Sequence, residues 1–137
     1  TKDSDSVAGF TKINIISFGF KYGIPSDADL VMDMRFLANP YFEPTLKHQD
    51  GESAAVKKFV LSNLETIDFL EKFTTLIAYL IPLYKRENKA YLTIAFGCTG
   101  GRHRSVAIAR SIFEHINSKG MSPGLIHRDI DRDAKNT

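Results

Sequence analysis

The sequence predicts an α/β fold: a single domain with a mostly parallel sheet, flanking helices and a glycine-rich anion-binding loop between a strand and a helix. Runs of β-branched and aromatic residues alternate with segments of helical periodicity, which is the pattern of a layered α/β domain. The 137 residues suit one domain and contain no internal repeat. We expect a flexible leader over residues 1–9, the domain over residues 10–130 and a polar tail over residues 131–137.

Four segments are predicted as strands: residues 13–18, 30–36, 91–96 and 123–130. The first, INIISF, is a β-branched run that ends at a glycine. The second, LVMDMRF, would place Asp33 and Arg35 on one face, because side chains two residues apart point the same way in a strand. Asn39-Pro40 and Glu43-Pro44 predict irregular chain as far as Thr45.

Helical spacing of apolar residues begins at Ser53 and predicts two helices, over residues 53–61 and 64–84, with Pro82 near the end of the second. A further amphipathic helix is predicted over residues 105–118 and is closed by Gly120. It follows the glycine-rich segment directly. Ligands of parallel sheets bind beyond the carboxyl ends of the strands, which is where this segment lies.

The composition excludes several classes of protein. Lys and Arg total 18 against 16 Asp and Glu, so the net charge of +2 is too small for nucleic-acid binding by bulk charge. One cysteine forms no internal disulfide, and no apolar run is long enough to span a membrane. The histidines and the cysteine lack metal-ligand spacing. We expect a cytoplasmic protein with no metal, no cofactor and no membrane partner.

The segment GCTGGRHRS joins the third strand to the last helix and predicts a phosphate site. Glycines allow the backbone to approach an anion closely, and the helix N-terminus adds partial positive charge. Two arginines supply forked donors, and two hydroxyls are also present. An ordinary turn with arginines facing water is the alternative. The candidate anion-binding residues are Asp33, Arg35, Cys98, Thr99, Gly100, Gly101, Arg102, His103, Arg104 and Ser105.

The same residues spell Cys-x5-Arg-Ser, the phosphate loop of cysteine-dependent phosphatases. There a thiolate attacks phosphorus and the arginine binds the equatorial oxygens, so Cys98 and Arg104 would be catalytic and Asp33 is the one attractive general acid. Gly97 stands where the tyrosine-phosphatase signature has a histidine. Cys98 is otherwise a small buried residue, and Asp33 with Arg35 an exposed charge pair.

A longer set of motifs resembles one known family. These motifs are Ser17–Pro25 (SFGFKYGIP), Asp27–Asp29 (DAD), Asp33–Leu37 (DMRFL), Asn39-Pro40, Tyr91–Ala95 (YLTIA) and Gly97–Ser105 (GCTGGRHRS). With them the chain resembles, from about Ile13 to about Arg128, the C-terminal domain of RapZ, the RNase adapter also called YvcJ. Members of that family usually carry a separate P-loop domain as well.

The resemblance implies a non-enzymatic, oligomeric module. Such a module binds small regulatory RNAs, presents them to an endoribonuclease and senses glucosamine-6-phosphate. RNA-binding members have histidine at the place of Tyr41 and lysine at the place of Arg102. Here the tail alternates acid with base, and Asp129, Asp131 and Asp133 should weaken RNA binding. The residues expected to serve RNA are Lys21, Tyr41, Arg102, His103, Arg104, His127 and Arg128.

Three functions therefore remain open from the sequence: a phosphosugar-sensing and RNA-binding adapter, a cysteine phosphatase and a pure oligomerisation module. They differ in what the loop does, namely bind an anion, turn over a phosphate ester or neither.

Overall fold

A computed structural model describes residues 11–132, and it confirms the α/β prediction. Within these residues the sheet has four parallel strands in the order β2-β3-β1-β4. Their bounds are Lys12–Gly19 for β1, Leu30–Asp33 for β2, Tyr91–Cys98 for β3 and Gly124–His127 for β4. The two central strands carry the most buried residues, because neighbours cover them on both edges.

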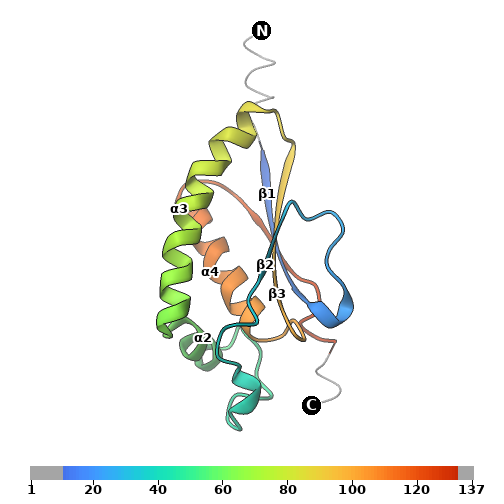
Figure 1. Ribbon diagram of the computed structural model, residues 1–137, viewed down its shortest axis with the longest axis vertical. Coiled ribbons are helices and arrows are strands. Elements are labelled where there is room, and N and C mark those ends of the chain that lie inside the picture. The colour runs from blue at the N-terminus through green and yellow to red at the C-terminus, as the bar shows by residue number, and fades with distance from the viewer. Residues whose placement is uncertain (1–10, 133–137) are drawn as a thin grey trace.

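The three α-helices are α2 (Ala54–Leu61), α3 (Leu64–Arg86) and α4 (Arg104–Ser118). They lie on one side of the sheet, and the chain between β1 and β2 lies on the other (Figure 1). Helix α4 packs against β1 and β3, while Phe73 of α3 meets Phe96 of β3 with ring centroids 5.3 Å apart. The core is therefore a layer of apolar side chains between helices and sheet. No helix within residues 11–132 is long and apolar enough to cross a bilayer.

The predicted break between two helices is confirmed. Ser53 precedes α2 and its hydroxyl accepts a hydrogen bond from the N–H of Val56 (3.3 Å), which is the usual side-chain cap of a helix N-terminus. Helix α3 contains Pro82 and continues past the predicted end at residue 84 to Arg86.

The second strand is shorter than predicted, and the expected common strand face of Asp33 and Arg35 is wrong. Strand β2 ends at Asp33, whose carboxylate accepts a hydrogen bond from the N–H of Arg35 (2.9 Å). An aspartate that binds the backbone two residues on makes a turn, so the chain folds back instead of continuing the sheet. The last strand likewise spans only Gly124–His127, and Pro40–Phe42 (η2) is a short 3-10 helix where irregular chain was expected.

The end of β1 and the glycine loop touch through their backbones. Gly101 has φ +77°, and a Cβ there would lie 2.5 Å from the backbone nitrogen of Gly19. A Cβ on Gly19 would in turn collide with the carbonyl carbon of Gly100. These glycines are required because no side chain fits between the two backbone segments.

We predict that Gly101→Ala lowers the free energy of unfolding by about 3 kcal/mol or more. The left-handed backbone costs about 1–2 kcal/mol for a residue with a Cβ, and the clash with Gly19 adds to it. Gly120→Ala is the control, because Gly120 also has positive φ (+86°) but open space around it, and should lose only the backbone part. Urea denaturation measures both, and equal losses would contradict the close approach.

Candidate anion-binding site

A pocket of about 420 Å³ lies at the carboxyl end of β3. One wall is the loop between β3 and α4, and the facing wall is the chain around η2. The lining residues are Lys21, Asn39, Tyr41, Phe42, Cys98, Thr99, Gly100, Arg102, His103 and Arg104. The pocket thus gathers eight of the residues singled out in the sequence and adds Asn39 and Phe42.

The lining is basic. Lys21, Arg102 and Arg104 carry positive charge, and none of the described residues that line the pocket is an aspartate or glutamate. A concave site with one sign of charge concentrates the opposite sign. The lining therefore favours an anion over a cation or a neutral ligand.

The loop backbone adds uncharged donors. Within residues 11–132, no protein group accepts a hydrogen bond from the backbone N–H of Thr99, Gly100, Gly101, Arg102 or His103. These five consecutive donors follow β3 and end where α4 begins. Backbone N–H groups require a partner, either water or a bound acceptor, and the helix N-terminus adds partial positive charge.

Arg104 forms part of the pocket floor. It is only 5% exposed, and its Nη1 donates hydrogen bonds to the carbonyls of Arg35 (2.8 Å) and Leu37 (3.1 Å). Burial lowers the pKa of Arg104, although the guanidinium stays charged at neutral pH. Its Nε is buried with no hydrogen-bond partner among the described residues.

Arg102 is held in a similar way. Its two terminal nitrogens donate to the carbonyls of Ile130 (2.9 Å) and His48 (2.8 Å), and its Nε likewise has no partner in residues 11–132. Each guanidinium is therefore fixed by backbone carbonyls while one of its donors is unsatisfied. Fixed cations lose little conformational entropy when they bind an acceptor.

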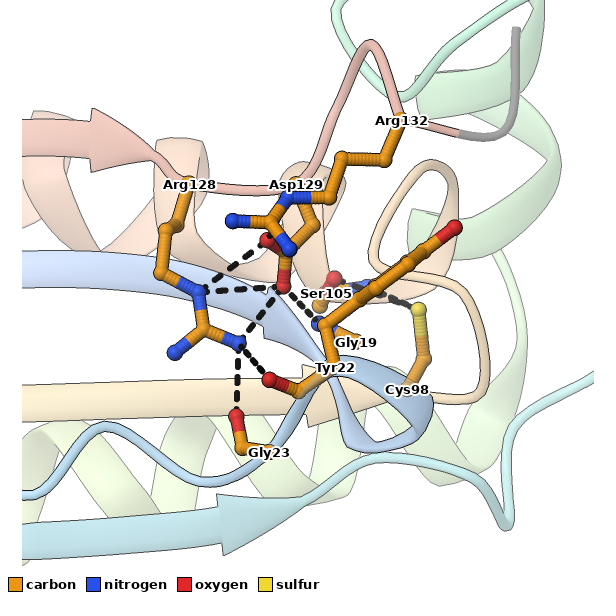
Figure 2. Close-up of polar contacts among 8 residues, drawn as sticks. All are labelled: Gly19, Tyr22, Gly23, Cys98, Ser105, Arg128, Asp129 and Arg132. Carbon is orange, nitrogen blue, oxygen red and sulfur yellow. Dashed lines mark hydrogen bonds and ion pairs between the residues drawn. The ribbon is translucent and has the colours of Figure 1, made fainter. Parts of the chain in front are cut away.

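The thiol of Cys98 is buried under the loop beside the start of α4. The backbone N–H of Ser105 donates to Sγ at 3.4 Å, and Sγ donates to the Ser105 hydroxyl at 3.1 Å (Figure 2). The thiol also raises the pKa of Arg104 in opposition to burial, so the two groups attract each other.

His103 is a neutral donor at the edge of the pocket. Its ring is buried, and its Nε2 lies 3.1 Å from the carbonyl of Lys47. Burial lowers the pKa of His103 below the usual range, and Arg102 and Arg104 act in the same direction. The imidazole is thus uncharged at neutral pH and gives the site no positive charge of its own.

Asp33 and Arg35 do not line the pocket. They form a two-bond pair, with Nε to Oδ1 at 2.9 Å and Nη2 to Oδ2 at 2.7 Å, and both side chains are about half exposed. Arg35 holds the pKa of Asp33 below its usual value, so Asp33 is a poor proton donor at neutral pH. The guanidinium also lies 3.9 Å from the ring centroid of Phe20.

Two of the residues expected to serve RNA, His127 and Arg128, make hydrogen bonds within the protein. His127 joins the hydroxyl of Ser17 to the carboxylate of Glu52, both at 2.7 Å. Arg128 donates to the carbonyl of Gly23 (2.6 Å) and to the carboxylate of Asp129. Neither lines the pocket.

Two of the candidate anion-binding residues lie behind the pocket lining. Gly101 contacts Gly19, and Ser105 contacts Cys98.

The acidic residue Asp129 proves to be a buried brace for the site. Its Oδ2 accepts a hydrogen bond from the N–H of Gly19 (2.8 Å), and Arg128 and Arg132 neutralise its charge (Figure 2). Because Gly19 touches Gly101, this carboxylate fixes the strand end against which the loop packs. Asp129 therefore presents no unpaired carboxylate to a ligand, and the expectation that it weakens RNA binding stays a prediction. Asp133 lies outside the described residues.

Sequence reasoning missed three contributors: Asn39, Phe42 and Asp129. Asn39 caps the short η2 helix and Phe42 is its last residue, and only the Asn-Pro turn signal marked that segment. Asp129 sits in a stretch of alternating charges, and nothing in that pattern tells a buried acid from an exposed one.

The fold and site together define a small α/β domain with a basic pocket at the carboxyl edge of a parallel sheet. Comparison with known proteins makes this specific: the RapZ C-terminal domain matches residues 11–131, and the chain belongs to that family.

Similar proteins agree with this assignment. A nucleotide-binding protein of Desulforapulum autotrophicum is 65% identical over 90% of the chain and 42% of its own length. Nucleotide-binding proteins of Desulfosudis oleivorans (53% over 87% of the chain and 41% of its own length) and Trichlorobacter lovleyi (49% over 96% and 46%) are also similar. The chain therefore spans less than half the length of these curated relatives.

We predict that Asp129→Ala lowers the free energy of unfolding by about 3 kcal/mol. The substitution removes a buried acceptor and leaves the N–H of Gly19 and two guanidinium groups without it. Asp131→Ala is the matched control, since Asp131 is exposed and should change stability by less than about 0.5 kcal/mol. Thermal denaturation of the two variants measures the difference, and an equal effect would remove Asp129 from its bracing role.

Proposed function

We propose that this domain is a non-enzymatic adapter module whose pocket binds the phosphate of a sugar such as glucosamine-6-phosphate, or of RNA. The proposal rests mainly on one observation within residues 11–132. Four lining residues, Thr99, Gly100, Arg102 and His103, have backbone N–H groups with no protein acceptor, and the lining includes the guanidinium groups of Arg102 and Arg104 and no carboxylate. Family membership supports the same function.

Phosphate is the anion that suits this arrangement. A phosphate monoester carries nearly two negative charges at neutral pH and three acceptor oxygens, enough for several N–H groups and a guanidinium at once. The neutral ring of His103 adds a polar group without changing the charge. The remainder of the pocket, near Asn39 and Tyr41, would accommodate the organic part of the ligand.

An RNA ligand would place a backbone phosphate on the same donors, so a phosphosugar and RNA should compete. We propose that this competition couples RNA binding to the supply of amino sugar in the cytoplasm. Small regulatory RNAs and an endoribonuclease are the proposed partners, and self-association of the domain would add the basic pockets of several copies.

The binding test is calorimetry with glucosamine-6-phosphate. Arg104→Ala should weaken binding about 10- to 100-fold, because a charge-assisted hydrogen bond contributes about 1.5–3 kcal/mol. The control is Arg110→Ala, which removes a guanidinium from the same helix, where it pairs with Glu52 at 3.0 Å and does not line the pocket. Melting curves verify that both variants fold. Equal affinity in wild type and Arg104→Ala would overturn the pocket assignment.

A cysteine phosphatase is the second candidate, because Ser105 supports the Cys98 thiol as a phosphatase loop would. One observation opposes it: Asp33, the candidate general acid, is paired with Arg35 away from the pocket lining and is not placed there to protonate a leaving group.

We therefore expect no turnover of p-nitrophenyl phosphate by the wild type, and unchanged phosphate binding in Cys98→Ser. Vanadate-sensitive turnover that disappears in Cys98→Ser would establish the phosphatase and reject the adapter.

A further inference from the structure

The rim of the pocket carries an exposed aromatic side chain that the anion site does not need. Phe42 is 75% exposed although it is fully apolar, and it lines the pocket together with the basic residues. Its neighbour Tyr41 packs edge-on against it, with ring centroids 5.6 Å apart and an interplanar angle of 86°. An exposed aromatic ring favours a ligand with a flat face, and the basic lining beside it favours a negative charge. A ligand that carries both would suit this end of the pocket.

Hydrogen bonds of the η2 turn fix the backbone that carries the Phe42 ring. Phe42 closes the short η2 helix, and its N–H donates to the carbonyl of Asn39 (3.2 Å). The side chain of Asn39 accepts from the N–H of Tyr41 (3.1 Å), and Pro40 is buried beneath the turn. The backbone that carries the Phe42 ring is therefore ordered before a second ring stacks on it.

The two rings differ in availability. Lys47 Nζ lies 4.7 Å from the ring centroid of Tyr41, so a cation already contacts that ring, whereas no cation–π contact involves Phe42 in the described part of the chain. Phe42 is the better stacking surface. A second exposed aromatic residue, Phe36, is 60% exposed but lies outside the pocket lining and packs near Phe69.

We propose that Phe42 is a stacking platform for an unpaired nucleobase, so that the pocket takes single-stranded RNA with one phosphate on the loop and the adjacent base on the ring. The inference rests on the proposed function and specifies its RNA class. Stacking on an aromatic ring combined with a basic groove is the common chemistry of single-strand binding, since every base has a flat face. Bases inside a duplex are already stacked and are not available to Phe42.

Tryptophan at this position gives a direct readout. The chain contains no tryptophan, so Phe42→Trp introduces a single fluorophore at the platform. An oligouridylate of about ten nucleotides should quench its emission, because a stacked base contacts the indole. A self-complementary duplex and inorganic phosphate should leave the emission unchanged. Phe36→Trp is the matched control and should respond to none of the three.

Affinity provides the second readout. By fluorescence anisotropy, Phe42→Ala should bind the labelled oligouridylate about 5- to 150-fold more weakly than wild type, whereas Phe36→Ala should bind normally. The dependence of affinity on salt should stay the same in Phe42→Ala, because no charge is lost. Binding of glucosamine-6-phosphate should also be unchanged.

Several results would overturn the inference. They are equal RNA affinity in Phe42→Ala and wild type, equal quenching by duplex and single strand, or a loss of phosphosugar binding in Phe42→Ala that would assign the ring to the sugar. Wild-type protein that binds the phosphosugar but no RNA would overturn the platform and leave the anion pocket intact. Wild-type protein that binds neither would remove the proposed function as well.

Discussion

The structure of the site depends on one close approach, the backbone contact between the end of β1 and the loop that follows β3. Gly19 and Gly101 permit it because neither has a Cβ, and Asp129 secures it by binding the N–H of Gly19. With the loop packed against this strand end, its amides remain unpaired within residues 11–132 and Cys98 sits below them. The segment that makes this close approach and the segment proposed to bind the anion are thus the same loop.

The positive charge of the pocket is preserved because three carboxylates of the domain are paired with cations outside its lining. Asp33 is occupied by Arg35, Glu52 by Arg110 and His127, and Asp129 by Arg128 and Arg132. Each acid is neutralised outside the pocket, while Arg102 and Arg104 are held by carbonyl oxygens that carry no full charge. The pocket keeps its positive potential even though the chain as a whole is nearly neutral. A net charge of +2 therefore says little about how strongly this surface attracts anions.

The sequence was informative wherever local physics decides the structure. β-branched runs and helical periodicity located the strands and helices, and the Cys98–Ser105 segment located the loop. The sequence did not predict the structure where a polar side chain can bind either nearby backbone or a residue far along the chain. Asp33 ends a strand by binding its neighbour, and Asp129 turns inward to Gly19. Phe42 was missed for the opposite reason, since an exposed phenylalanine has the same signature in sequence as a buried one. Long-range contacts of this kind produce no repeating pattern in the sequence from which they could be predicted.

The buried floor and the exposed rim of this pocket tolerate change very differently. Arg104, Ser105 and Gly101 are committed to contacts inside the protein, so replacing them disturbs the fold as well as any ligand. Tyr41 and Phe42 project from a short helix at the surface, where substitution affects little besides the pocket mouth. Evolution can therefore exchange the rim residues while the loop between β3 and α4 is retained, so that related domains can acquire pockets of different specificity on the same fold.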